Sequence, residues 1–458
     1  MKKISIMFVC FFLIAPVAGL AGVGEKSVSV TVYNSNLALV EETRPVFPSG
    51  KEALVRWENV PTQIDPTSVH LHWLGGYRNA ILEQNFEYDL VNVQKLFRKY
   101  IDQTVQLKLK DQSVLSGRLL SAGESIVLET SDKSIVSVQS GEIVQYKFRE
   151  LPEGLITRPT LIWTLEKPVA KKQRMQVEYL TSGMNWHAEY VGVLSEKEDR
   201  LDVSGWVSLE NHSGATFNRA ALKLVAGQPH RVSGRMPIAY ENRLAKATVQ
   251  AAVPRFSERA AFEYHLYNLK GKTTLKQNET KQIPLFGSKQ VKFQKIYKFD
   301  GERWGKAVKV FLRFRNTQAE GIGQPLPAGK FRIYQKNSPQ SSIFLGEDRI
   351  NHTPKEETVT LEVGNAFDVS GKRIQTAVKK VAKRKRQESY LLDIRNFKDQ
   401  PVTVEAIEHL NYLAQRSQWE ILKSSREFEK KDARTIVFRL KVGAHNVAKV
   451  TYTVRYEW

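Results

Sequence analysis

Side chains that could do chemistry are scattered along this sequence rather than grouped in a catalytic motif. His70 and His72 would point to the same face of a strand, as metal ligands can. No third ligand follows nearby, so we interpret them as two polar strand residues. The chain has no HExxH, P-loop or GxSxG pattern, and its one cysteine, Cys10, lies in an apolar N-terminal stretch. We therefore predict no catalytic residue, no metal site and no cofactor.

The densest charge cluster is the run KKVAKRKR at residues 379–386, and no acid occurs between Gly371 and Gln387. Its six cations form a candidate polyanion-binding patch: Lys379, Lys380, Lys383, Arg384, Lys385 and Arg386. The alternative is a solvated loop or strand pair, because blocks of like charge are often exposed and mobile.

The first 21 residues have the layout of a secretory signal peptide. Lys2 and Lys3 precede an almost purely apolar stretch that is short for a membrane span, Pro16 breaks it, and Gly19 and Ala21 are small. We expect cleavage at or near Ala21. The alternative is an N-terminal membrane anchor. No later stretch reaches the ~20 apolar residues of a spanning helix.

Export and charge together indicate where the chain works. The formal charge is +21, and loss of Lys2 and Lys3 leaves +19, which favours anionic lipid, lipopolysaccharide or acidic glycans as partners. Another envelope protein is a further possible partner. Nucleic acid is a poor candidate, since export separates the two. A mature chain without cysteine fits a bacterial periplasm or cell surface better than a disulfide-rich secreted class.

Alternating apolar and polar residues predict an all-β fold. Leu201, Val203, Val207 and Leu209 alternate with polar positions, and Gly, Pro, Asn and Asp punctuate such runs at short intervals. We expect several antiparallel, immunoglobulin-like β-sandwich units. One short helix is predicted near residues 90–100, with Asp89 as its cap.

The spacing of strands and turns divides the chain further. Five short strands in residues 101–150 predict a small SH3-like or Sm-like barrel insert, with a structural role. The full division runs 1–21 signal peptide, 22–100 N-terminal β domain with the helix, 101–150 insert, 151–228 part of a sandwich, 229–260 exposed loop or linker, and 261–458 C-terminal sandwich region. Asn211, Asn316 and Asn396 each end a strand, where the Asn side chain can bond backbone groups.

Several segments together carry a family resemblance, and it runs through nearly the whole mature chain. They include Tyr33-Asn34-Ser35-Asn36-Leu37, Ile64-Asp65-Pro66-Thr67-Ser68, Gly205-Trp206-Val207-Ser208-Leu209-Glu210-Asn211, Pro325-Leu326-Pro327-Ala328-Gly329, Phe344-Leu345-Gly346-Glu347-Asp348 and Gly364-Asn365-Ala366-Phe367-Asp368. In this order they resemble bacterial proteins with the domain of unknown function 4139, which include the mucoidy inhibitor A proteins. The resemblance implies an exported, β-rich protein without an assigned activity. The 101–150 insert departs from the helical segment of other members.

Two classes of function remain open. The first is a non-enzymatic binding or scaffolding protein of the envelope. The second is a hydrolase acting on an envelope polysaccharide or cell-wall polymer. A hydrolase needs two carboxylates, or a nucleophile and a base, within a few ångströms. The charges in this sequence are instead spread along strands, so we favour binding, although glycosidase carboxylates can lie far apart in sequence.

Overall fold

The computed structural model describes residues 26–47, 51–227, 229–230, 256–261, 264–338, 341–410 and 418–458. Strands account for 64% and helices for 3% of this part, which confirms the all-β class. None of its helices is both long and apolar enough to cross a membrane. The predicted signal peptide and most of the predicted 229–260 loop lie outside the described residues. Residues 256–260 of that loop, however, belong to a strand, β16 (Phe256–Ala261).

The described part of the chain divides into two compact units, one drawn from residues 26–29 and 40–180, the other from residues 30–39 and 181–458. The division passes through the hairpin of β1 (Ser27–Tyr33) and β2 (Leu37–Val46). It therefore differs from the predicted boundaries at residues 150 and 228.

The first unit is built around an apolar central strand, β11 (Thr160–Leu165). β11 pairs with β3 (Leu54–Glu58) and β5 (Ile81–Glu87), while β4 (His70–Trp73) pairs with β12 (Gln173–Thr181). Trp163 of β11 is fully buried, and its indole N–H donates to Gln84 Oε1 at 2.8 Å. A 3-10 turn, η1 (Pro66–Ser68), is capped by the Asp65 side chain. β11 is thus the central strand of its sheet, and side chains on both of its faces are buried.

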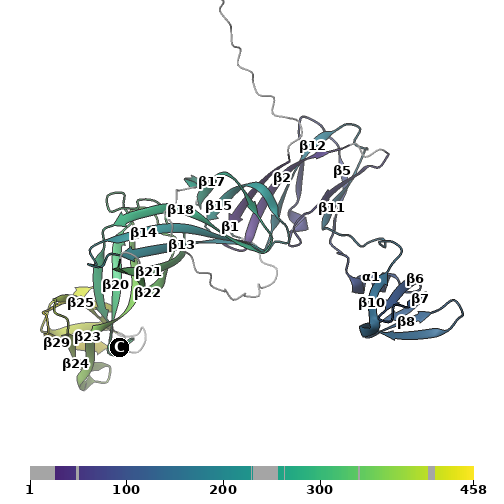
Figure 1. The fold of residues 1–458 in the computed structure, drawn as a ribbon. Coiled ribbons are helices and arrows are strands. Elements are labelled where there is room, and N and C mark those ends of the chain that lie inside the picture. Colours follow the sequence, from purple (N-terminus) through teal and green to yellow (C-terminus); the bar gives the residue numbers. More distant parts are fainter. Residues whose placement is uncertain are drawn as a thin grey trace, which may run out of the picture. The chain divides into compact units, whose positions relative to one another are not determined.

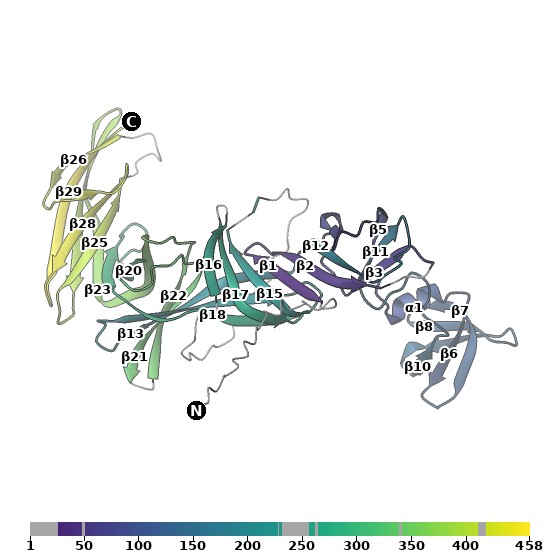
Figure 2. The same cartoon turned by 90° about the horizontal axis from the view of Figure 1, so that it is seen from above.

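The predicted insert is present as one five-stranded sheet with a helix, α1 (Val93–Lys99), beside it (Figure 2). Its strands lie in the order β10 (Ile143–Lys147), β6 (Thr104–Leu109), β7 (Val114–Ala122), β8 (Ser125–Glu129) and β9 (Ile135–Gln139), with η2 (Ser140–Glu142) before β10. Phe97 of α1 packs into the core of this sheet. Its assignment as an SH3-like or Sm-like barrel stays a prediction.

The helix cap differs from the prediction. Asn92, not Asp89, accepts the hydrogen bond from the Lys95 backbone N–H, at 2.9 Å. Asp89 instead forms an ion pair with the Lys95 side chain at 2.7 Å. Both residue types suit a helix start, and the helix simply begins three residues later than Asp89 would require.

The second unit contains three groups of strands (Figure 1). One sheet has the order β18 (Glu279–Val291), β14 (Leu201–Asn211), β13 (Met184–Leu194), β21 (Gly329–Ser338) and β22 (Ser341–Ile350). In a second group β17 (Tyr264–Leu275) pairs with β15 (Phe217–Ala226) and with β16. The third is a nine-stranded sheet ordered β26 (Gln418–Ser424), β29 (Val447–Glu457), β24 (Lys385–Asn396), β23 (Thr358–Ala382), β20 (Ala307–Arg315), β19 (Gln294–Phe299), β25 (Val402–His409), β28 (Thr435–Val442) and β27 (Glu429–Lys430).

Most of the strand pairs described above are antiparallel, as expected, but β13 pairs with β21, and β19 with β25, in parallel. The 25-residue strand β23 is shared, because its first half pairs with β20 and its second half with β24. One core cluster takes buried residues from β24 and β29 and also from β25 and β28. The nine-stranded sheet thus encloses its own core; whether it is an immunoglobulin-like sandwich stays a prediction.

The three strand-ending asparagines have the same role, as expected. Asn211, Asn316 and Asn396 are at most 1% exposed. Each Nδ2 donates to two or more backbone carbonyls of neighbouring segments, for example to Ala215 at 2.9 Å and to Leu275 at 3.2 Å from Asn211. The amide therefore satisfies buried carbonyls where strands end and loops begin.

We predict that Asn211→Asp destabilises the protein, because a carboxylate oxygen would face carbonyls that need a donor. The free energy of unfolding should fall by about 3 kcal/mol or more. Denaturant unfolding followed by tryptophan fluorescence measures it. Asn351→Asp, at an exposed position, is the control and should change stability little. Equal effects of the two substitutions would contradict this role of Asn211.

Candidate functional site

The predicted basic run forms the tip of one β-hairpin. β23 and β24 pair antiparallel, with Lys380 opposite Arg386 and Ala382 opposite Lys385. Lys383 and Arg384 make the two-residue turn between them. All six cations predicted from the sequence therefore lie on one short hairpin end, which we call the basic tip (residues 379–386).

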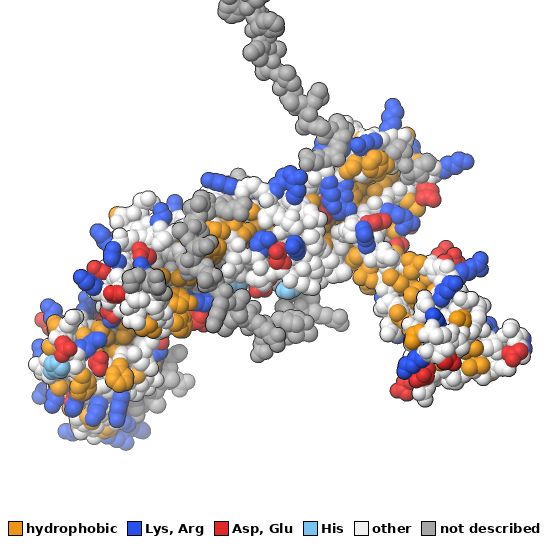
Figure 3. All heavy atoms as spheres, viewed as in Figure 1, with side chains coloured by type: hydrophobic (Ala, Val, Ile, Leu, Met, Phe, Trp, Pro, Cys, Tyr) orange, Lys and Arg blue, Asp and Glu red, His pale blue; other side chains and the backbone are white. Residues whose placement is uncertain are grey.

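The basic tip is only partly neutralised. Lys385 forms an ion pair with Glu457 at 3.0 Å, and Arg386 forms one with Glu388 at 2.6 Å. The other four cations are exposed, and the described residues provide no carboxylate within ion-pair distance of them: Lys379, Lys380, Lys383 and Arg384. In Figure 3 Lys and Arg side chains gather over this end of the C-terminal sheet. A concentrated positive potential remains there, since no local acid cancels it.

Two exposed apolar side chains lie beside these cations. Val378 is 49% exposed and Val381 is 47% exposed, both on the β23 side of the tip. Each stands next to an exposed lysine in the sequence, Lys379 or Lys380. The tip thus offers both charge and a small apolar area to a partner.

A buried ion pair lies at the base of this hairpin. Arg373 of β23 donates from Nε to Glu408 Oε2 of β25 at 2.8 Å, and the Glu408 side chain is fully buried. The Tyr452 hydroxyl of β29 donates to the same carboxylate oxygen. Three strands that are distant in the sequence are joined at one carboxylate, which fixes the inner end of the hairpin.

The network continues from this pair toward the tip. The Arg373 guanidinium lies 3.9 Å from the centroid of the Tyr390 ring, a cation–π contact. The Tyr390 hydroxyl donates to Glu388 at 2.5 Å, and Arg386 reaches the other oxygen of Glu388. A chain of contacts therefore runs from the buried Glu408 to the first partly exposed arginine of the basic tip.

Burial shifts the titration of these groups. It raises the pKa of Glu408 above its usual range, and the neighbouring Arg373 and Tyr452 offset that rise only in part. Burial, together with the hydrogen bond to Glu388, raises the pKa of Tyr390 to about 12. Tyr390 therefore stays protonated at neutral pH and keeps its donor role. Perturbed carboxylates can mark an active site, but substrate cannot reach Glu408.

His70 and His72 lie exposed on the edge strand β4, opposite Glu178 and Gln176 of β12. In the described part of the chain, no group of three or more His, Cys, Asp or Glu side chains is arranged to hold a metal ion.

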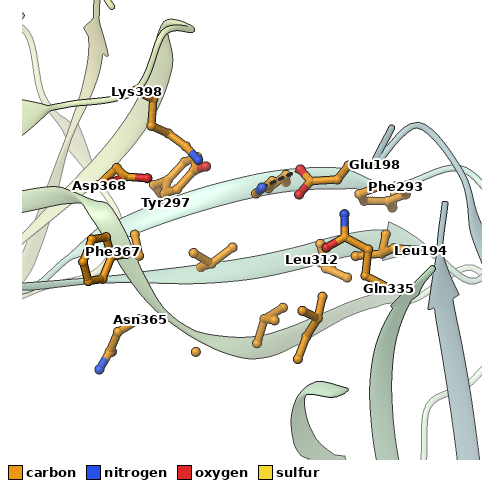
Figure 4. Close-up of a pocket in the computed structure, with 16 residues that line it drawn as sticks. Leu194, Glu198, Phe293, Tyr297, Leu312, Gln335, Asn365, Phe367, Asp368 and Lys398 are labelled. Atoms are coloured by element: carbon orange, nitrogen blue, oxygen red, sulfur yellow. Dashed lines mark hydrogen bonds and ion pairs between the residues drawn. The ribbon is translucent and has the colours of Figure 1, made fainter. Parts of the chain in front are cut away.

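One pocket of about 280 Å³ lies in the second unit, away from the basic tip. Its acids are Glu198 and Asp368, which Figure 4 shows at opposite ends. Glu198 is paired with Lys295 at 2.6 Å. Sequence reasoning missed this pocket, because its lining comes from six strands and their connecting loops.

Comparison with known proteins adds no relative: no protein-family model matches the chain, and no curated protein is similar to it. The resemblance to proteins with domain 4139 therefore stays a prediction. The geometry of the chain itself must carry any functional argument.

We predict that Glu408→Gln lowers the free energy of unfolding by about 3 kcal/mol, because it leaves the partly buried Arg373 without its counter-charge. Chemical denaturation of the purified protein measures this. Glu420→Gln is the matched control, since Glu420 also pairs with an arginine, Arg455, but is 60% exposed. Glu420→Gln should lower the free energy of unfolding by less than about 1 kcal/mol. Losses of similar size would show that the buried pair has no special role.

Proposed function

We propose that this chain is an exported bacterial envelope protein that binds rather than catalyses, and that the basic tip attaches it to an anionic surface. The observation that carries the proposal is the set of four exposed cations without acidic partners at the end of a hairpin with a buried, hydrogen-bonded base. A periplasmic or cell-surface location and membership in the domain 4139 family belong to the same proposal.

The physical basis is charge attraction with little loss of conformational freedom. Each Lys or Arg near an anionic lipid surface contributes about 1 kcal/mol. Paired strands and the two-residue turn between them hold the four cations together, so binding orders fewer backbone groups than it would in a free loop. Phospholipid headgroups and acidic polysaccharides both supply the required phosphates or carboxylates. The neighbouring Val378 and Val381 can add apolar contact at a lipid surface.

The alternative, a hydrolase of an envelope polymer, has weaker support. Glycosidases place two carboxylates about 5–10 Å apart in an accessible cleft. Glu408, whose pKa is raised by burial, and its buried neighbour Asp300 are each only 1% exposed, so a polymer cannot reach them. In the pocket, Glu198 is already neutralised by Lys295. Binding is therefore the better-supported function.

We predict that a tip variant loses affinity for anionic surfaces. It combines Lys379→Gln, Lys380→Gln, Lys383→Gln and Arg384→Gln. Cosedimentation with phosphatidylglycerol vesicles and retention on polygalacturonate should both be measured from about 0.1 to 1 M salt, over which the screening length falls from about 10 to 3 Å. The native protein should release steeply with salt, and the variant should bind at least about tenfold more weakly.

A control variant removes the same number of charges elsewhere, at exposed positions in both units: Lys147→Gln, Lys171→Gln, Lys197→Gln and Lys355→Gln. It should retain most of the affinity. If both variants bind equally, net charge rather than the basic tip is responsible, and the proposed site is wrong. Preference for vesicles over polygalacturonate, or the reverse, identifies the source of the anions.

A further inference from the structure

A large bulge in β23 presents one aromatic ring fully to solvent. In the pairing of β20 with β23, Ala307 faces Ser370 and Lys309 faces Asn365, so residues 366–369 stand opposite Val308 alone. Phe367, within this bulge, is 98% exposed. Bulges of this kind re-aim side chains and recur beside functional sites. A fully solvated phenylalanine contributes no buried apolar area to folding, and its ring is accessible to a ligand.

The bulge forms one wall of the 280 Å³ pocket. The floor of the pocket is apolar and is made by Leu194, Val310, Leu312, Leu345, Val363 and Ala366. Phe367, Asp368 and Lys398 lie together at one end, and Asn365 projects from the same strand (Figure 4). Within the described part of the chain, neither Asn365 nor Asp368 has a side-chain hydrogen-bond partner, so both can serve a ligand.

The charges around the pocket cancel. Lys295 is paired with Glu198 at 2.6 Å, and the exposed Asp368 offsets Lys398. A neutral ligand therefore suits this site, in contrast to the basic tip. The volume is just below the range of about 300–1,000 Å³ that holds drug-sized ligands, so it suits a single ring.

We propose that this pocket binds one neutral sugar ring that carries an acetamido group. The Phe367 ring would stack on the C–H face of the sugar. Asp368 and Asn365 would bond its hydroxyl and amide groups. The acetamido methyl would lie on the apolar floor, where a plain sugar would instead bury hydroxyls without partners. The proposal is independent of the basic tip, and either can fail alone.

Saturation-transfer NMR with the full chain tests this, using N,N′-diacetylchitobiose as the probe. Saturation should be strongest at the acetamido methyl protons. Phe367→Ala should weaken binding about three- to tenfold, the range of an aromatic stacking contact. Because Phe367 is 98% exposed, its removal should not disturb folding. Phe397→Ala removes another exposed ring, one that does not line the pocket, and should leave binding unchanged.

Two further probes test which chemical groups of the ligand the pocket recognises. Cellobiose has the same linkage without the acetamido groups and should bind at least about threefold more weakly, since it lacks the buried methyl. N-acetylalanine methylamide stands for a peptide and should bind more weakly than the sugar. No saturation transfer to the disaccharide, equal binding of cellobiose, stronger binding of the peptide probe, or no effect of Phe367→Ala would each overturn the proposal.

Discussion

The ion pair between Arg373 and Glu408 is the contact on which the C-terminal sheet depends. The Glu408 carboxylate has lost its water, so only Arg373 and the Tyr452 hydroxyl compensate its charge. The three residues come from β23, β25 and β29, which must therefore keep one relative arrangement. The same contact lies at the inner end of the β23–β24 hairpin, whose outer end carries the four exposed cations.

Strand β23 links the two candidate binding features of the second unit. Its first half pairs with β20 and carries the bulge with Phe367, and its second half pairs with β24 and ends in the basic tip. The two surfaces differ in electrostatics: cations without acidic partners dominate the tip, whereas charges cancel around the pocket. Both features suit a binding protein, since both offer recognition groups without a nucleophile and base in reach of each other.

The parts of this structure that depend on local pattern could be predicted from the sequence. Alternation of apolar and polar residues predicted the strands, and the spacing of turn residues predicted the five short strands of the insert. Asn211, Asn316 and Asn396 were expected to bond backbone groups. The Arg373–Glu408 pair spans 35 residues and three strands, so no local pattern reveals it. The bulge at Phe367 depends on the register against β20, and the parallel pairs depend on chain crossovers. The sequence did not identify Asn92 as the helix cap in place of Asp89, because Asp and Asn are equally suitable cap residues.

Cross-linking inside the intact envelope tests the central claim most directly. A photoreactive benzoylphenylalanine at Val381 keeps every cation of the basic tip, and the same group at Val114 of the insert serves as the reference; both positions are exposed. Irradiation of the cells that make the protein, followed by mass spectrometry, identifies what each position touches. The account predicts adducts of an anionic lipid or acidic polysaccharide at Val381 and not at Val114. Absence of anionic adducts at Val381, or equal adducts at both positions, would contradict it.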